Sequence, residues 1–254
     1  MLHAVWDVVA GVRVRGHVND RAYRERAEGA RCHPERAPDP ERAERVEGSP
    51  HGREGSAPPH VVLVHGLGMA ANSLEPPMRA LGDRLAASAL DLPGFGKSKA
   101  HGRHLSLAEL ADALTEWLRV RGIRAPILVG QSHGCQVVVE AVAREPLALV
   151  PHVVRDYARA GPARLIATLR DAVRDRIEDK LACVDVPVTI VNGARDPVSP
   201  PAWGERLARL TGMHVGGAGA RYVVVADAAH AVPFSRPAAL AAEVVGIARR
   251  LAGS

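Results

Sequence analysis

Aromatic residues are scarce in this sequence: Phe, Trp and Tyr make up 3% of the 254 residues, although 47% of the chain is hydrophobic. A core must therefore consist of Val, Leu, Ile and Ala, and the chain is long enough for one domain with a sizeable core. Lysine is scarce too, with three residues among 33 basic ones. The net charge is +5, but acids and bases are interspersed and no basic cluster alternates with aromatic residues. This pattern argues against a nucleic-acid partner.

Cysteines and long apolar runs are also few. Cys32, Cys135 and Cys183 give neither a disulfide framework nor the spacing of metal ligands. No apolar run approaches the length of a membrane span, and residues 1–7 lack the charged head and long apolar segment of a secretory signal. We therefore expect a cytoplasmic protein with no membrane partner, no metal and no cofactor.

The chain divides into three stretches of different character. Residues 4–18 carry spaced valines around Gly11, which predicts two strands joined by a turn. Residues 19–59 hold eight arginines and nine acidic residues with hardly any large apolar side chain, so we expect a solvated, largely disordered insertion, with a partner-binding arm as the alternative. From Pro59 onward strands and helices alternate. This predicts one α/β domain over residues 1–254, with a mostly parallel sheet and helices on both faces.

A serine between two glycines follows one of the predicted strands. Residues 127–129 are apolar, residues 130–134 read Gly-Gln-Ser-His-Gly, and a helix-compatible run follows. A tight strand-to-helix turn has no room for side chains at Gly130 and Gly134, and it would expose the hydroxyl of Ser132. Because a Gly-rich turn also arises by chance, the pentapeptide needs support from the rest of the chain.

That support comes from four further segments, each of which follows a predicted strand. The strands cover 61–64, 85–90, 188–191 and 222–225, and they lead into His65-Gly66-Leu67-Gly68, Asp91–Ser98, a turn ending in Asp196-Pro197 and a turn ending in His230. This order of motifs resembles the α/β-hydrolase family of serine hydrolases over the whole chain except about 40 residues near its start. Several motifs in the same order are far more specific than any one of them.

The resemblance implies the order Ser…Asp…His of reacting residues, which Ser132, Asp196 and His230 meet. A serine hydroxyl needs a base to take its proton, and that base needs an acid to orient it. A surface or core histidine is the plainer interpretation of His230 alone, but its position after the last strand and before the last helix favours the base. Asp227 is a rival acid on the wrong strand. We expect Asp196, and not Asp227, within hydrogen-bond distance of the imidazole.

Two backbone amides are expected to hold the oxyanion of an acyl-transfer intermediate, those of Leu67 and His133. Gly66 leaves the backbone near Leu67 free to approach the substrate. We expect His65 to form hydrogen bonds under its loop rather than react. The side chain of His133 is expected to point away from the substrate.

The segment after the helix that follows Ser132 departs from the family pattern. The strand expected there is limited to residues 147–150, between two prolines, so we expect it to be rudimentary or absent. A lost strand would move its neighbours by about 4.8 Å and misplace the acid. Predicted helices at 152–160 and 162–181 would then form a reduced lid within residues 145–182.

The sequence thus predicts a serine hydrolase that cleaves an ester or related acyl bond of a small molecule through an acyl-enzyme. A small lid would leave the site open and suit short, soluble acyl substrates. The alternatives are a carbon–carbon bond hydrolase or a cofactor-free haloperoxidase of the same fold. A non-catalytic relative is the alternative from another class, and the shortened region 144–151 favours it.

Overall fold

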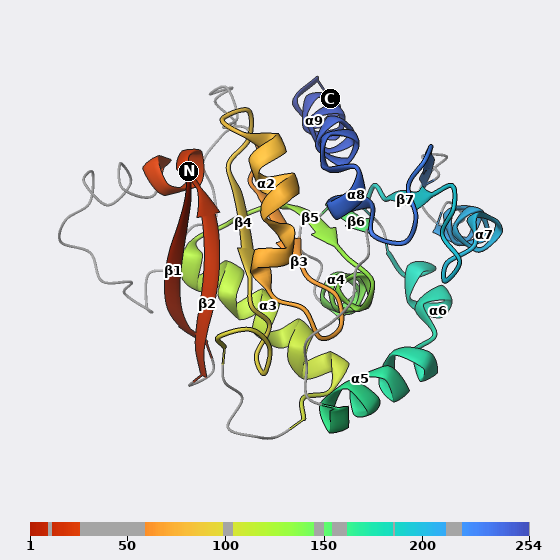
Figure 1. Ribbon diagram of the computed structural model, residues 1–254, viewed down its shortest axis with the longest axis horizontal. Helices are drawn as coiled ribbons and strands as arrows, with labels where there is room; N and C mark the ends of the chain where they lie inside the picture. The colour runs from red at the N-terminus through yellow and green to blue at the C-terminus, as the bar shows by residue number, and fades with distance from the viewer. Residues whose placement is uncertain are drawn as a thin grey trace, which may run out of the picture.

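The computed structural model describes residues 1–9, 12–25, 59–98, 104–144, 150–153, 162–184, 186–211 and 220–253. Eight strands form one sheet in the order β1-β2-β4-β3-β5-β6-β7-β8 (Figure 1). Their bounds are β1 Leu2–Val9, β2 Val12–Asn19, β3 Val61–Val64, β4 Ala87–Leu90, β5 Ile127–Gly130, β6 Val150–Val153, β7 Thr189–Gly193 and β8 Arg221–Val225. Strands β1 and β2 pair antiparallel with their neighbours and the remaining strands are parallel. The predicted α/β fold is therefore confirmed.

Side chains alternate between the two faces of the sheet and are buried on both. Val62, Val64 and Leu128 belong to one core cluster, together with residues of α3 and α4, whereas Val61 and Leu63 belong to the other, with α2 and α9. A strand buried on both faces is apolar throughout, as in parallel sheets covered by helices. The helices are η2 Ala71–Leu74, α2 Glu75–Leu81, α3 Leu107–Arg121, α4 His133–Arg144, α5 Pro162–Arg174, α6 Ile177–Leu181, α7 Pro201–Thr211, α8 Val232–Ser235 and α9 Pro237–Gly253.

Local sequence signals explain where helix α3 begins and ends. Ser106 caps its first turn and Glu109 completes a capping box, and Gly122 ends the helix in the left-handed conformation. None of the helices in the described ranges is long and apolar enough to cross a membrane.

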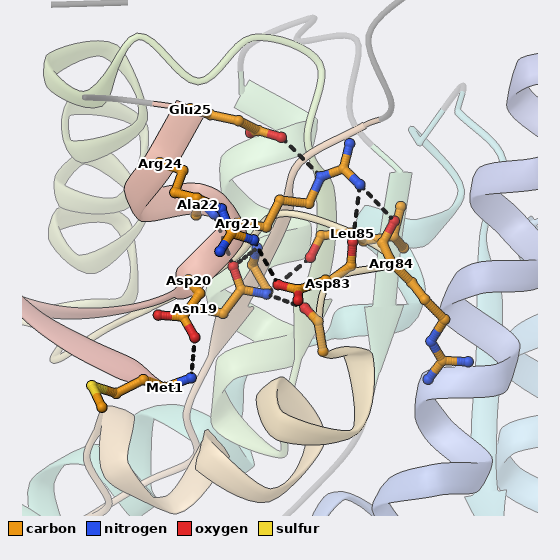
Figure 2. Close-up of polar contacts among 12 residues, drawn as sticks. Met1, Asn19, Asp20, Arg21, Ala22, Arg24, Glu25, Asp83, Arg84 and Leu85 are labelled. Carbon is orange, nitrogen blue, oxygen red and sulfur yellow. Dashed lines mark hydrogen bonds and ion pairs between the residues drawn. The ribbon is translucent and has the colours of Figure 1, made fainter. Parts of the chain in front are cut away.

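The N-terminal hairpin has the expected form, although its turn lies outside the described residues. The charged segment expected from residue 19 onward has an ordered start, because residues 20–25 are helical. Asn19 is buried, and its side-chain amide donates to the carbonyl oxygens of Gly82 and Leu85, at 2.9 Å each (Figure 2). Arg21 donates to the carbonyl oxygen of Asp83 at 3.0 Å. The boundary at residue 19 was therefore too early; residues 26–58, which hold most of the segment, lie outside the described part.

Strand β6 corrects the expectation of a rudimentary or absent strand. It has four residues, as do β3, β4 and β5, and it lies three residues later than the 147–150 predicted. It pairs with β5 along its whole length and with β7 from His152 onward. Pro151 argued against a central strand because proline has no N–H to donate. Its place before the β7 ladder begins makes the proline tolerable.

The lid also differs from the prediction. Residues 152 and 153 are in β6 rather than in a helix, and the rest of the predicted helix 152–160 lies outside the described residues. The helix predicted over 162–181 is broken into α5 and α6 at residues 175 and 176. We call α5 and α6 the lid; Figure 1 shows α6 between α5 and α7, on the right of the view.

Candidate active site

A cavity of about 990 Å³ lies between the lid, α4 and α7. Its wall contains Ser132, His133, Asp196, His230 and Leu67, so the five residues expected to react or to hold the oxyanion come together from four separate segments. The remaining wall is mostly apolar and includes Leu169, Ala172, Val173, Ile177, Leu181, Ile190, Val191, Val198, Trp203, Leu207 and Val232, with Asp175, Arg176, Glu178 and Arg206 among its charged members. An apolar cavity with a few polar groups is the usual form of a small-molecule site.

The turn that carries Ser132 is held by backbone contacts too close for a side chain. Ser132 has a φ of 52°, in the region that non-glycine residues seldom occupy. A Cβ atom on Gly134 would lie 2.3 Å from the carbonyl oxygen of Val64, and one on Gly130 would lie 2.6 Å from the Cα of Cys135. Both glycines are therefore needed for α4 to start directly against β3 and β5. A strained conformation of this kind is typical of a functional position.

Asp196 and His230 are joined by a short hydrogen bond. The ring Nδ1 of His230 lies 2.5 Å from Oδ1 of Asp196, and both side chains are largely buried. The backbone amides of Val198 and Ser199 also donate to Oδ1, each at 2.9 Å. Burial raises the pKa of Asp196, but these amides and His230 outweigh it and hold that pKa below its usual value. The ionised carboxylate only accepts, so Nδ1 of His230 donates and Nε2 is left as the basic nitrogen.

Asp227 does not take part in this contact. Its carboxylate accepts a hydrogen bond of 2.6 Å from Arg195, and both side chains are about two-thirds exposed. The sequence argument that set Asp227 aside relied on its place in the chain, and the geometry agrees with that choice.

Gly193 is a site residue that the sequence analysis missed. It ends β7 just before the Asp196 turn, and a Cβ atom there would lie 2.2 Å from the carbonyl oxygen of Ala229. The segments that bear Asp196 and His230 can approach only because residue 193 has no side chain. The Asn192-Gly193 pair after an apolar strand is a turn signal, but nothing in it indicates the segment that packs there.

Leu67 and His133, whose backbone amides are the expected oxyanion donors, both line the cavity. The amide of His133 lies in the first turn of α4, where N–H groups have no partner within the helix. The Leu67 loop is supported from below by the buried His65, whose Nδ1 contacts the carbonyl oxygen of Gly66 at 2.8 Å and whose Nε2 accepts from the amide of Leu92 at 3.0 Å. Burial lowers the pKa of His65 to about 4, so the ring is neutral. The expected supporting role of His65 is confirmed.

The side chain of His133 was expected to point away from the substrate, and this stays a prediction. Its Nδ1 lies 2.9 Å from Oε1 of Gln136, itself a residue of the cavity wall. Gln136 reaches across to the lid and had no signal in the sequence. Within the described residues, no group of three or more His, Cys, Asp or Glu side chains could hold a metal ion.

Comparisons with known proteins agree with this fold. Residues 59–162 match the family described as alpha/beta hydrolase fold. The pimeloyl-[acyl-carrier protein] methyl ester esterase of Neisseria meningitidis serogroup C is 38% identical over 95 residues, which are 37% of this chain and 35% of that protein. The chain thus spans about a third of the length of the curated relatives that it matches.

Solved structures match the fold along nearly the whole chain. An E-2-(acetamidomethylene)succinate hydrolase superposes with a TM-score of 0.72 at 16% identity, covering 97% of this chain and 98% of that one. A thermophilic esterase from Thermogutta terrifontis gives a TM-score of 0.70 at 16% identity and covers 98% of both chains. Taken with the sheet order and the match over residues 59–162, these likenesses show that the chain has the fold of the α/β hydrolases.

Proposed function

We propose that the protein is a serine hydrolase that cleaves an ester or a related acyl bond of a small molecule. The observation that carries the proposal is the hydrogen bond between His230 and an ionised Asp196, in the same cavity as Ser132 on its strained turn. An acid that orients an imidazole, and an imidazole that serves a serine, form the constellation that activates a hydroxyl.

In the proposed reaction, Oγ of Ser132 attacks the carbonyl carbon while Nε2 of His230 takes the hydroxyl proton. The amides of Leu67 and His133 donate to the oxyanion of the tetrahedral intermediate. The intermediate collapses to an acyl-serine, and the leaving alcohol takes the proton from His230. A water molecule deprotonated by His230 then attacks the acyl-serine, and the acid leaves as Ser132 recovers its proton.

The size of the cavity bears on the substrate. A volume of about 990 Å³ lies at the upper end of the range for small-molecule pockets and exceeds the needs of an acetyl or propionyl group. The expectation of short acyl substrates followed from an open site under a reduced lid. We now place the optimum at medium-length or branched acyl groups, with the apolar side chains of the lid and α7 around the chain.

The test is covalent labelling and turnover of the wild type and two serine variants. Wild type should bind a fluorophosphonate probe covalently and hydrolyse p-nitrophenyl esters, with the best chain length above four carbons. Ser132→Ala should lose labelling and at least about 10⁴-fold in kcat, because it removes the nucleophile. The matched control is Ser235→Ala, on an exposed serine of α8, which should keep both.

Two outcomes would contradict the proposal. Ser132→Ala with wild-type turnover would remove Ser132 from the mechanism. A folded wild type without labelling and without turnover of any ester would favour the non-catalytic alternative. Methyl esters belong in the panel because the curated relatives are named for methyl ester hydrolysis.

A further inference from the structure

A chain of hydrogen bonds runs along the cavity wall between α4 and the lid. The side-chain nitrogen of Gln136 donates to the carbonyl oxygen of Ala172 at 2.9 Å and to Oδ2 of Asp175 at 3.0 Å. Both partners accept only, so a flipped amide would set oxygen against oxygen at both contacts. The orientation of Gln136 is therefore fixed, with its Oε1 toward His133.

This orientation determines which nitrogen of His133 carries the proton. Nδ1 of His133 lies 2.9 Å from Oε1 of Gln136, and an amide oxygen cannot donate. Nδ1 must therefore bear the hydrogen. Burial lowers the pKa of His133, so the ring is neutral near pH 7 and Nε2 carries a lone pair. The imidazole is an acceptor at Nε2 and cannot donate there.

Nε2 of His133 has no hydrogen-bond partner among the described residues, and the residue is only 4% exposed. A buried acceptor without a partner is costly, and such groups in folded proteins call for an explanation. His133, which follows Ser132 in the chain, is one of the residues that line the cavity. Gln136, Ala172 and Asp175 line it too. The residue that holds this buried acceptor thus belongs to the wall of the proposed substrate site, next to the proposed nucleophile.

Ion pairs between charged side chains hold this part of the cavity wall to α4. Lys180 of α6 forms an ion pair with Asp175, and its Nζ lies 2.5 Å from Oε2 of Glu140 on α4. The lysine keeps Asp175 in place as the acceptor of the Gln136 amide. Because its hydrogen-bond partners are fixed in this way, the imidazole of His133 is preorganised to accept a hydrogen bond at Nε2.

We infer that Nε2 of His133 selects substrates that carry a hydrogen-bond donor, a hydroxyl or an amide N–H, near the scissile ester. This inference rests on the proposed function and names the substrate class of the same site. A substrate with such a donor completes the hydrogen bonding of Nε2, whereas an alkyl ester of the same size leaves it buried and unpartnered. The donor belongs either to the acyl part or to the alcohol part of the ester, and the experiment separates the two.

The experiment compares kcat/KM for esters that differ by one group. In the acyl arm, p-nitrophenyl 3-hydroxyhexanoate is paired with p-nitrophenyl 3-methylhexanoate. In the alcohol arm, 2-hydroxyethyl hexanoate is paired with propyl hexanoate. We expect wild type to prefer the hydroxyl compound by roughly ten-fold or more in one arm, since a buried polar group left unpaired is penalised strongly.

Three variants test whether His133 causes the preference for the hydroxyl compound. His133→Phe keeps the backbone amide and the ring shape but has no acceptor, so the preference should fall below about three-fold. His133→Gln offers an amide oxygen near the position of Nε2 and should restore part of it. The matched control is His104→Phe, on a histidine that pairs with Asp171 and is not part of the cavity wall; it should keep the full preference. Each preference is the ratio of kcat/KM for two esters measured on the same protein. A substitution that lowers the turnover of both esters equally therefore leaves the preference unchanged.

The outcomes are distinct. Turnover of all four esters without a hydroxyl preference in either arm of the wild type would overturn the inference and leave the proposed function standing, and this result needs no variant to fold. A preference that survives in His133→Phe would place the donor elsewhere and overturn it as well. No turnover of any ester would contradict the proposed function itself.

Discussion

The turn around Ser132 and the lid opposite it are held in different ways. On the nucleophile side, Gly130 and Gly134 bring backbone atoms so close that no side chain fits. On the lid side, α5 and α6 are tied to the body by polar side chains: Gln136 reaches Ala172 and Asp175, and Trp203 donates to Glu178 at 3.2 Å. The nucleophile side of the cavity depends on close backbone contacts, which tolerate no added side chain. The lid side depends on side-chain hydrogen bonds, which a substitution can replace with other contacts.

The difference teaches where this protein can change without losing its proposed chemistry. Substitutions in the turn should abolish the site together with the fold around it. Substitutions in the lid should alter which substrate binds while Ser132, Asp196 and His230 stay in place. The three predictions below test this contrast, from the largest expected effect to the smallest.

Gly134→Ala should have the largest effect. The added Cβ would meet the carbonyl oxygen of Val64 at 2.3 Å, and neither β3 nor α4 can retreat in a packed sheet. We expect a loss of about 3 kcal/mol or more in the free energy of unfolding, or roughly 6–12 °C in Tm, together with loss of fluorophosphonate labelling. Thermal denaturation followed by circular dichroism measures it.

The matched control for this substitution is Gly246→Ala in α9. The nearest atom to the new Cβ there is a guanidinium nitrogen of Arg250 at 3.5 Å, an ordinary contact. Alanine is the better helix former, so Tm should stay or rise. Equal losses in the two variants would show that the close contact at Gly134 is not what holds the turn.

Lowering the pH should have the second-largest effect, a loss of folding stability on the nucleophile side of the cavity. Burial lowers the pKa of His65 from 6.5 to about 4, so the folded state resists the proton that the unfolded state takes up. The stabilisation from neutral His65 is complete above pH 6.5 and is lost progressively as pH falls toward 4. A shift of this size corresponds to roughly 3 kcal/mol. Urea denaturation at pH 7 and pH 4.5 should show a large part of that loss.

Hydrogen exchange during the same acidification locates the effect. The histidines with lowered pKa values are His17, His60, His65 and His133, and among the described residues none of them belongs to the lid. Amides of β2, β3 and the Leu67 loop should therefore lose protection first. Earlier loss in α5 and α6 would reverse the proposed contrast between the two sides.

Glu178→Gln should have the smallest effect. Glu178 accepts from Trp203 at 3.2 Å and from Arg206 at 3.4 Å, and these contacts tie α6 to α7 beside the cavity. Glutamine keeps an oxygen but not the charge, and the side chain is about one-third exposed, so Tm should change by less than about 3 °C. KM for medium-chain esters should rise by a few fold with kcat nearly unchanged. Glu205→Gln, at an exposed ion pair on the outer part of α7, is the control and should change neither constant.

Most of the fold and the three candidate reacting residues could be predicted because their signals are local. An apolar strand followed by a glycine-bounded serine, or by a turn with Asp196, is visible within ten residues of sequence. The expected contact between Asp196 and His230 was implied by the resemblance to the α/β-hydrolase family, in which the reacting residues follow in the order Ser…Asp…His. Strand β6 was misplaced because Pro151 was taken as its boundary, although the ladder with β7 begins only after that residue.

The contacts that shape the cavity could not be predicted. Gln136 and Asp175 are 39 residues apart, and Gly193 meets a backbone oxygen 36 residues later. Contacts between residues so far apart in the sequence leave no periodic pattern in it, because they depend on how the lid packs against α4. The acceptor at His133 follows from those contacts and was missed with them.

The backbone conformation of Ser132 sets the proposed chemistry against the stability of the fold. A φ of 52° costs a side-chain-bearing residue on the order of 1 kcal/mol, and alanine in its place would bear the same cost. Glycine would not. A chain with Ser132→Gly should therefore melt above one with Ser132→Ala, although both lack the hydroxyl. Glycine at position 132 would thus relieve the backbone cost, but it would also remove the hydroxyl on which the proposed reaction depends.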